Sequence, residues 1–283
     1  MPAVAVQAAG QQAEGLFLRV RQLVDSYDSI ECGTRHQIDL FDHQILGAGH
    51  YYQQGHGLRR LSRFELRSQI GNRTTTLFEV SDGNYFWTFR ENSVATTLTR
   101  VDLLRVSQAL EQSRRAAPAI AAREPAIGEL PKLLAGIADD FRFERVVDGR
   151  LGDRPVWVVE GIWKPEKLIE AVPDQKANIE AGRPLDLKRL PTQLPERIVL
   201  SIGQTDLFPY RIEYLRRTSN SAVDGAGQGG GAPGYRAIVS MEWFDVQINR
   251  PIDPQKFVYQ PTGWTDATEV FLKALNLAPA APK

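Results

Sequence analysis

All four histidines of the chain, His36, His43, His50 and His56, lie within one short stretch of the sequence. Imidazole is the commonest metal ligand in proteins, so this clustering is the first candidate for a metal site. The histidines fall in a region with strand and turn patterns, where their spacing places His36 and His43 on opposite faces of the chain. No H-E-x-x-H motif is present. The pattern therefore favours surface histidines, and we predict no bound metal.

The segment GAGQGG, residues 225–230, has the G-x-G-x-x-G spacing of dinucleotide-binding loops. That fingerprint requires a preceding strand and a following helix whose N-terminus meets the pyrophosphate. Here Pro233 and Gly234 follow the glycines, and a strand pattern begins after them. The segment is therefore predicted to be a flexible loop, and we expect no cofactor.

Residue types that serve as catalytic nucleophiles are present, but their neighbours single none of them out. Cys32, the only cysteine, precedes Gly33 in a predicted turn and is interpreted as a free thiol. The sequence has no P-loop, no G-x-S-x-G motif and no paired acidic motif for Mg²⁺. We therefore expect no catalytic residues and no enzymatic activity. A lipid or glycan hydrolase, with a serine, a histidine and a carboxylate converging in the fold, is the least favoured alternative.

Arginine residues gather in two strand-like stretches of the sequence. Alternation along a strand explains most of them as the solvent-exposed face of a sheet. The functional interpretation is a basic rim that contacts phosphate or carboxylate head groups at the mouth of a cavity. The residues are Arg59, Arg60, Arg63 and Arg67 in the first stretch and Arg211, Arg216 and Arg217 in the second.

Aromatic residues are the most informative feature of the sequence. In LFEVSDGNYFWTF, residues 77–89, rings flank the pair Asp82-Gly83, and such a pair between two β-rich runs predicts a hairpin. Pairing outward from a two-residue turn places Phe78 opposite Trp87 and Val80 opposite Tyr85. Because side chains alternate along a strand, one face collects Phe78, Val80, Tyr85, Trp87 and Phe89.

Similar apolar runs recur on other predicted strands. Two interpretations of them are open: a protein core covered by helices, or the wall of a cavity that takes an apolar ligand. The candidate ligand-binding residues are therefore Phe64, Leu66, Phe78, Val80, Tyr85, Trp87, Phe89, Tyr210, Ile212 and Tyr214 for the apolar part, with Arg59, Arg60 and Arg63 for a head group.

Hydrophobic periodicity predicts the elements that position these residues. A helix is expected over residues 11–29, followed by a meander of strands and a helical insert over 101–140. Strands resume at 141–163 and at 196–217, on either side of a lid-like segment over 164–195. This order predicts an α+β fold with a curved antiparallel sheet and helices on one side.

The 34 Lys and Arg residues balance the 34 Asp and Glu residues, so the formal net charge is zero. Bulk charge therefore gives no attraction to nucleic acid, and we expect no nucleic-acid partner. No run approaches the roughly 20 apolar residues of a membrane helix. The first residues, MPAVAVQAAG, have the small-residue spacing found near signal-peptidase sites, which favours an exported protein whose signal peptide is absent from this sequence. A disordered cytosolic tail is the open alternative.

Two motifs resemble those of the LolA-like periplasmic lipoprotein carriers. FEVSDGNYFWTF is similar to the v-S-D-G-x-x-x-W-x-y hairpin of that family, and IDPQKFVYQPTGW is similar to its closing d-x-x-x-F-x-f-x-P-P-x-G motif. The sequence departs from the family at Thr262, which stands for the second proline, and in LRRLSRF, which lacks the family's arginine-proline step. The matching residues are Val80, Ser81, Asp82, Gly83 and Trp87 in the hairpin and Phe257, Pro261 and Gly263 at the close.

The resemblance implies an incomplete (half) barrel of antiparallel strands wrapped around helices, with a hydrophobic cavity for acyl chains and no catalytic residues. Proteins of this fold ferry lipoproteins or bind lipid, and others regulate periplasmic stress responses, so the fold does not settle the function. We expect a divergent member that is exported to the periplasm and holds lipid or lipoprotein acyl chains. It would exchange them with a membrane-bound donor or acceptor protein, and we expect a monomer. The alternative is a sensor or interaction module whose barrel is filled by its own side chains.

The expected domain organisation is simple. Residues 1–11 are predicted to form a disordered tail, residues 12–275 a single LolA-like domain, and residues 276–283 a flexible C-terminal tail.

Overall fold

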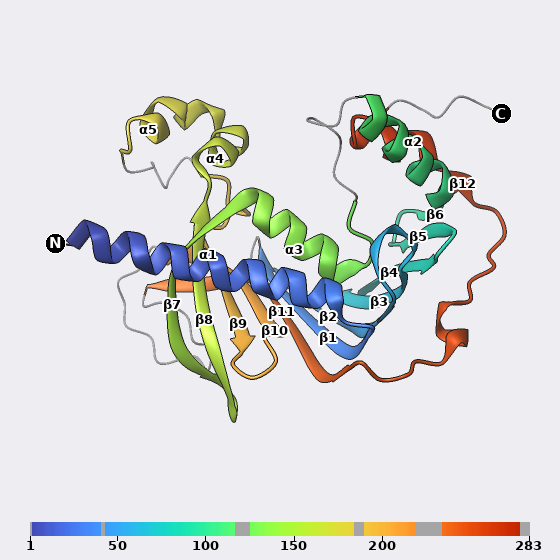
Figure 1. Cartoon of the computed structure of the whole chain (residues 1–283), viewed down its shortest axis with the longest axis horizontal. Helices are drawn as coiled ribbons and strands as arrows, with labels where there is room; N and C mark the ends of the chain where they lie inside the picture. The colour runs from blue at the N-terminus through green and yellow to red at the C-terminus, as the bar shows by residue number, and fades with distance from the viewer. Residues whose placement is uncertain (1, 41–42, 117–124, 184–189, 219–233, 278–283) are drawn as a thin grey trace. The chain divides into compact units, whose positions relative to one another are not determined.

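The computed structural model describes residues 2–40, 43–116, 125–183, 190–218 and 234–277 (Figure 1). The α-helices within these residues are α1 (Pro2–Ser26), α2 (Leu103–Ala116), α3 (Glu129–Asp140), α4 (Pro165–Ala171), α5 (Lys176–Glu180) and α6 (Thr268–Ala274). The strands are β1 (Ser29–Leu40), β2 (His43–Gln54), β3 (Leu61–Ile70), β4 (Arg73–Asp82), β5 (Tyr85–Glu91), β6 (Thr96–Asp102), β7 (Phe141–Leu151), β8 (Arg154–Trp163), β9 (Arg197–Gly203), β10 (Pro209–Arg217), β11 (Tyr235–Ile248) and β12 (Thr265–Asp266). Among the described helices, none is both long and apolar enough to cross a membrane.

The strands form one sheet in the order β12-β6-β5-β4-β3-β2-β1-β11-β10-β9-β8-β7. Hairpin neighbours such as β3–β4, β4–β5 and β7–β8 pair antiparallel, whereas the short β12 pairs parallel with β6. Because β12 and β7 stand at the two ends of the order, the sheet does not close. The expected α+β class, with a curved and mostly antiparallel open sheet, is confirmed.

The chain forms two compact units. Unit 1 comprises residues 1–24, 36–46 and 134–243, and unit 2 comprises residues 25–35, 47–133 and 244–283. Strands β1, β2 and β11 contribute residues to both units. The single domain expected over residues 12–275 remains a prediction.

The core of unit 1 forms where an amphipathic helix meets a hairpin. Leu16, Phe17 and Val20 recur at helical spacing on α1 and are buried. The ring of Phe17 packs 4.3 Å from that of Phe143 on β7, and the Phe143 amide donates to the Glu14 carboxylate at 2.6 Å. Helix α1 begins at Pro2. The disordered tail expected over residues 1–11 remains a prediction.

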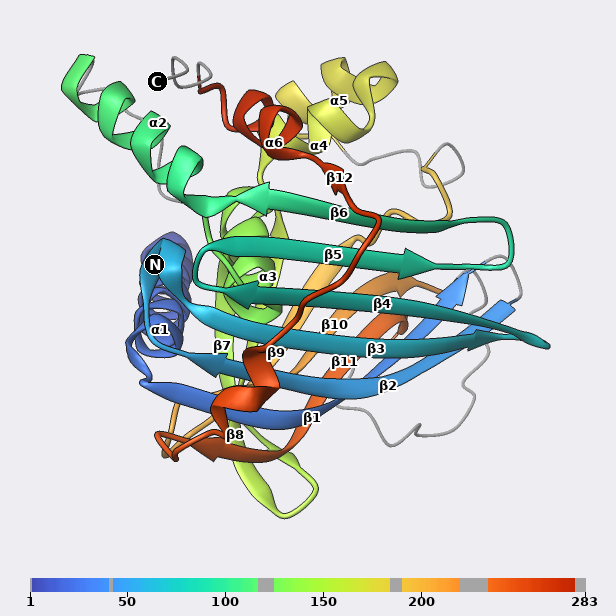
Figure 2. The ribbon, with the colours of Figure 1, turned by 90° about the vertical axis from the view of Figure 1, so that its right-hand side faces the viewer.

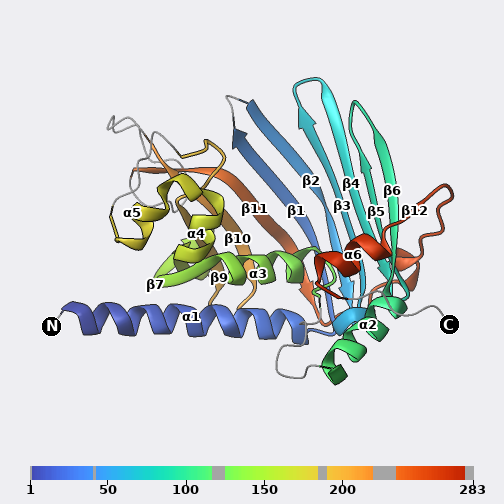
Figure 3. The same cartoon turned by 90° about the horizontal axis from the view of Figure 1, so that it is seen from above.

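The core of unit 2 is built around α2. Asp102 caps this helix, because its carboxylate accepts hydrogen bonds from the amides of Leu104 and Arg105 at 3.0 and 3.1 Å. The buried face of α2 packs with α6, which lies beside it in Figure 3. The cluster consists of Leu58, Phe86, Val101, Leu103, Val106, Ala109, Leu110, Ile127, Leu272 and Leu277.

The hairpin of β4 and β5 is present, but its expected pairing was wrong by two residues. Phe78 pairs with Phe89 and Val80 with Trp87, rather than with Trp87 and Tyr85. The turn is longer because the Asp82 carboxylate accepts hydrogen bonds from the next two non-glycine amides along the chain, at 2.8 and 2.7 Å. A shift of two residues keeps every side chain on its expected face.

The two segments expected to interrupt the strands both contain helices. The insert over residues 101–140 contains α2 and α3, and the lid-like segment over 164–195 contains α4 and α5. The glycine-rich motif at 225–230 and residues 278–283 of the expected C-terminal tail lie outside the described residues.

Candidate functional site

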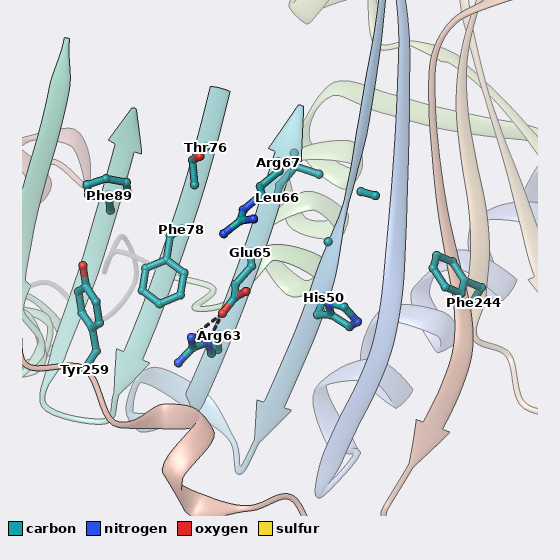
Figure 4. Close-up of a pocket in the computed structure, with 12 residues that line it drawn as sticks. His50, Arg63, Glu65, Leu66, Arg67, Thr76, Phe78, Phe89, Phe244 and Tyr259 are labelled. Carbon is teal, nitrogen blue, oxygen red and sulfur yellow. Dashed lines mark hydrogen bonds and ion pairs between the residues drawn. The ribbon is translucent and has the colours of Figure 1, made fainter. Parts of the chain in front are cut away.

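A pocket of about 720 Å³ lies on one face of the strands of unit 2 (Figure 4). Strand β3 supplies its charged side chains, β4 and β5 supply phenylalanines, and a segment near the C-terminus supplies a tyrosine. The lining residues are Ala48, Gly49, His50, Arg63, Glu65, Leu66, Arg67, Thr76, Phe78, Phe89, Phe244 and Tyr259.

Strand register explains why these residues meet. Glu65 pairs with Phe78, and Phe78 pairs with Phe89, so the three side chains form a row across β3, β4 and β5. Arg63 and Arg67 lie two residues to either side of Glu65 and therefore point to the same face. The result is a wall of alternating charged and aromatic side chains.

The C-terminal strap, residues 252–264, covers one side of this face. It runs across β3, β4 and β5 in Figure 2. The Tyr259 ring packs 4.8 Å from Phe78 and 5.9 Å from Trp87, and the Trp264 ring lies 6.0 Å from Trp87. Phe257 anchors the strap because it is buried. The two motifs that carry the family resemblance therefore contact each other.

Small residues leave room at the other side of the pocket. The Phe244 ring rests on Gly33, where an added Cβ would lie 2.4 Å from the ring. Ala48 presents only a methyl group. At Gly49 an added Cβ would lie 1.6 Å from the Glu65 carbonyl oxygen, so β2 approaches β3 closely here. In Figure 4, Phe244 lies on one side of His50, and Phe78 and Tyr259 lie on the other.

The two arginines that line the pocket differ in whether a carboxylate lies beside them. Arg63 binds the Glu65 carboxylate at 2.5 Å and the Lys256 carbonyl at 3.0 Å, and its guanidinium lies 4.7 Å from the Phe78 ring centre. No ion pair joins the exposed Arg67 to another residue of the described chain. The pocket therefore keeps one uncompensated cation at its rim. Burial raises the pKa of the Tyr259 hydroxyl, with the nearby Arg63 acting against it.

The five residues that were predicted to share one face of the hairpin differ in their exposure. Phe78 and Phe89 line the pocket, whereas Val80 and Trp87 are buried. Tyr85 lies under the guanidinium of Arg100, 4.4 Å from the ring centre. Thus the face shared by these five residues is real, and only part of it is open.

Phe64 does not belong to this face. It pairs with Glu79, so it points to the side of the sheet where Lys132 of α3 reaches the Glu79 carboxylate at 3.1 Å. The residues of β3 that share the face of Phe78 are the charged ones, Arg63, Glu65 and Arg67. Leu66 contributes to the pocket lining.

Only Arg63 of the three predicted head-group arginines lines the pocket. Arg59 holds the β4–β5 turn by donating to the Gly83 carbonyl and the Asn84 side chain at 3.4 and 3.2 Å. Arg60 is 2% exposed and donates to the carbonyls of Gly55 and Ile127 and to the carboxylate of Asp25. Both of these arginines have structural contacts that the sequence pattern does not reveal.

The aromatic run on β10 belongs to unit 1 and is packed. Ile212 is fully buried, and the Tyr214 ring lies 6.0 Å from Phe141. The Tyr210 hydroxyl donates to the Asp206 carboxylate at 2.5 Å. Here the first interpretation, a core of the protein's own side chains, describes these residues.

The remaining arginines of the second stretch are tied to neighbouring residues rather than forming a free rim. Arg216 donates to the carbonyls of Leu190, Pro191 and Leu194, and so fastens the end of the segment over residues 164–195 to β10. Arg217 donates to the Tyr235 hydroxyl at 3.0 Å.

The four histidines have different surroundings. Burial lowers the pKa of His36 to about 4. His50 is exposed and lines the pocket, His43 is exposed, and His56 donates to the Asp25 carbonyl at 2.9 Å. Within the described ranges, no three His, Cys, Asp or Glu side chains lie together as metal ligands would. Burial also raises the pKa of the Cys32 thiol.

Sequence reasoning missed Tyr259, Phe244 and His50 as pocket residues. The signal for Tyr259 was present, because it lies inside the closing motif. Phe244 and His50 carry no local signal, since β11 and β2 enter the pocket through long-range pairing. The alternating patterns of β3 and β4 did mark three further lining residues as polar positions: Glu65, Arg67 and Thr76.

Neither of two sequence comparisons found a relative: no family model and no curated protein matches the chain. Several solved structures are similar in fold. One is an outer-membrane lipoprotein-sorting protein domain from Vibrio parahaemolyticus, with a TM-score of 0.31 and 8% identity over 88% of this chain and 97% of that chain. Another is LprF from Mycobacterium bovis, with a TM-score of 0.38 and 8% identity over 86% of this chain and 95% of that chain.

The MucA/MucB complex of Pseudomonas aeruginosa is also similar, with a TM-score of 0.37 and 10% identity over 88% of this chain. The match covers 61% of that chain, so the present chain spans about three fifths of its length.

Proposed function

We propose that the protein is a non-enzymatic binding or carrier protein that holds an amphiphile in the pocket of unit 2. The amphiphile would be a lipid or the acyl chain of a lipoprotein. The observation that carries the proposal is the combination of aromatic lining and cationic side chains in one pocket of about 720 Å³. Pockets that bury small molecules have volumes of about 300 to 1,000 Å³, so the size suits such a ligand.

The apolar part of the ligand would lie against the rings of Phe78, Phe89, Phe244 and Tyr259. Each methylene group removed from water contributes about 0.8 kcal/mol. A chain of about ten methylene groups would therefore gain up to about 8 kcal/mol, before the cost of ordering the ligand is subtracted. Affinity that comes from burying methylene groups requires no particular arrangement of polar side chains.

The head group would lie at the rim, where Arg67 is exposed. Arg63 is compensated by Glu65, so Arg67 supplies the attraction for a phosphate or carboxylate. An exposed cation contributes modestly to affinity and more to the orientation of the ligand.

An exported, periplasmic location and exchange of the ligand with a membrane-bound donor or acceptor protein are supported by the two motifs that resemble the carriers. A monomer is proposed for the same reason.

A second candidate function is a module that binds an apolar peptide segment of a partner protein. One observation favours it: the strap is itself a peptide, and its Tyr259 already packs on Phe78 and Trp87 at this face. On the opposite face, side chains of α2 pack with Phe86 and Val101, as in a self-filled barrel.

The test fills the pocket without removing a contact. Ala48 is exposed and lines the pocket, so Ala48→Phe adds a ring in the space that the ligand would occupy. Leu46→Phe is the matched control, because Leu46 is 51% exposed two residues earlier on β2 and is not a lining residue. Fluorescence titration with dansylaminoundecanoic acid measures binding to the three proteins.

We expect the unmodified protein and Leu46→Phe to bind the probe and Ala48→Phe to lose most of its affinity. Mass spectrometry of organic extracts from the purified protein would then identify the natural amphiphile. If the unmodified protein neither binds the probe nor yields a lipid, the amphiphile proposal is wrong. Binding that is equal in all three proteins would place the ligand elsewhere.

A further inference from the structure

A second pocket, of about 500 Å³, lies in unit 1 and has a different chemistry. Arg211 and Glu213 point into it from β10, Ser201 from β9 and Glu242 from β11. The pairing of Arg211 with Ser201 on one side and with Glu242 on the other places the three polar side chains in one row. This pocket lies on the face of β10 opposite to the buried Ile212.

Two polar side chains of this pocket are largely buried, and no side-chain hydrogen bond or ion pair within the described residues involves them. Glu213 and Ser201 are each 8% exposed. The Nε atom of Arg211 is also buried and has no hydrogen-bond partner within the described chain, although a terminal nitrogen of the same guanidinium binds Glu242 at 3.2 Å. Polar groups this deep are normally hydrogen-bonded, so the pocket presents an acceptor at Glu213 and a hydroxyl at Ser201 that a ligand could satisfy.

The charges of the pocket indicate what could satisfy these groups. Arg150, Arg211, Glu213 and Glu242 sum to a formal charge of zero. An anionic ligand would meet the two carboxylates, and a cationic ligand would meet the two guanidinium groups. A neutral ligand with hydroxyl groups avoids both penalties, because a hydroxyl donates to a carboxylate and accepts from a guanidinium N–H.

The apolar lining agrees with the same class of ligand. Val158, Val199 and Leu151 border the polar row. A saccharide or cyclic polyol carries C–H groups beside its hydroxyls, so one ring can pack on the valines while its hydroxyls reach Glu213 and Arg211. A volume of about 500 Å³ lies in the range of small-molecule pockets.

We propose that this pocket of unit 1 binds a neutral saccharide or cyclic polyol, whose hydroxyls donate to the Glu213 carboxylate and accept from a terminal N–H of the Arg211 guanidinium. The Ser201 hydroxyl takes a further hydrogen bond from the ring. This site is independent of the amphiphile pocket, since none of its residues belongs to unit 2.

The experiment is saturation-transfer difference NMR on the full chain with four probes at millimolar concentration. D-glucose and myo-inositol are neutral, D-glucosamine is the cationic analogue of the first, and D-glucuronate is the anionic one. We expect saturation transfer to glucose or inositol and weaker transfer to both charged analogues. No transfer to either neutral probe, or stronger transfer to a charged analogue, would overturn the proposal.

Two variants connect the signal to the pocket. Glu213→Gln keeps the size of the side chain and removes its charge, so we expect an affinity loss of about five- to tenfold, and Ser201→Ala a smaller loss. Glu160→Gln is the control, because Glu160 lies on the neighbouring β8, is similarly buried and has Arg145 and Arg197 as partners outside the pocket. Circular dichroism checks that each variant is folded. Affinity unchanged in Glu213→Gln, or lost equally in Glu160→Gln, would contradict the assignment.

Discussion

The two faces of β4 and β5 in unit 2 carry aromatic rings of similar size, yet one face is filled and the other is hollow. Phe86 points to the filled face, where it is 9% exposed and packs in the cluster with Val101 and Leu103. Phe89, three residues later, points to the hollow face and lines a pocket of about 720 Å³. The difference lies in what covers each face: helix α2 on one, and the narrow strap on the other.

Strand β10 of unit 1 repeats the contrast with other residues. Ile212 is fully buried on one face, and its neighbours Arg211 and Glu213 line a pocket on the other. In both units one face of a strand is packed against other elements, and the opposite face lines a pocket. Alternation along a strand therefore assigns a side chain to a face, whereas the covering element decides whether that face can hold a ligand.

The sharpest test of this contrast replaces one ring on each face by alanine. Phe86→Ala removes a buried ring from a packed cluster, and we expect unfolding to become easier by about 3 to 5 kcal/mol. Phe89 is partly buried, so Phe89→Ala should cost only about 1 to 2 kcal/mol. Denaturation with urea, followed by circular dichroism, measures both.

Ligand binding should respond in the opposite order. Phe86→Ala leaves the pocket lining unchanged, so the folded variant should bind dansylaminoundecanoic acid as before, while Phe89→Ala should bind it more weakly. If the two substitutions cost the same stability and the same affinity, the distinction between the faces is wrong.

A second test compares two arginines that the sequence pattern does not distinguish. Arg60→Met keeps the apolar stem but removes the donors to two backbone carbonyls and to the Asp25 carboxylate. Buried acceptors that lose their partners cost about 1 to 3 kcal/mol, so we expect a loss of roughly 2 to 3 kcal/mol in urea denaturation. Arg59→Met is the control at the exposed neighbouring position, with an expected loss within about 0.5 kcal/mol. Equal losses would show that the buried contacts of Arg60 are unimportant.

Much of the fold follows from local signals in the sequence. The period of two along residues 61–70 gives β3, the Asp82-Gly83 turn gives the β4–β5 hairpin, and the helices of the 101–140 insert have helical periodicity. These signals are local because each depends on neighbouring residues. The exact pairing was missed by two residues, since it depends on how the Asp82 carboxylate shapes the turn.

The candidate site was predicted less completely, for a physical reason. Phe78, Phe89 and Arg63 were found because their own strands mark them. Phe244 was not, because its place depends on the absence of a side chain at Gly33, more than 200 positions earlier in the chain. The contacts of Arg60 could not be predicted, because burial of a guanidinium among carbonyl groups leaves no trace in the local pattern.

A third test concerns the hollow face of unit 1 and uses pH. Burial raises the pKa of Glu213 above 4.5, with Glu242 adding to the rise and Arg211 opposing it. The native protein therefore binds this proton more tightly than the unfolded chain does. Stability falls as the pH rises through the window from 4.5 up to the raised pKa, and the charged carboxylate destabilises the protein at neutral pH.

Glu213→Gln removes this charge, so we expect the variant to be more stable than the unmodified protein at neutral pH, by about 1 kcal/mol. The gain should disappear below pH 4.5, where Glu213 is protonated in both the folded and unfolded states. Thermal unfolding across this pH range measures the difference. A variant that is less stable at neutral pH would mean that the Glu213 carboxylate has a favourable partner.

The smallest expected effect concerns the rim of the amphiphile pocket. Arg67 is exposed and lines the pocket, so Arg67→Gln should leave stability within about 0.5 kcal/mol of the original value. An exposed charge pair contributes about 0.2 to 1 kcal/mol, so the affinity for dansylaminoundecanoic acid should fall about two- to fivefold. The loss should shrink at high salt, because screening weakens the attraction in the unmodified protein. The corresponding alcohol, dansylaminoundecanol, has no carboxylate and should bind both proteins equally. If the acid and the alcohol lose the same affinity, the aliphatic stem of Arg67 packs on the ligand, and the charge of Arg67 does not orient the ligand.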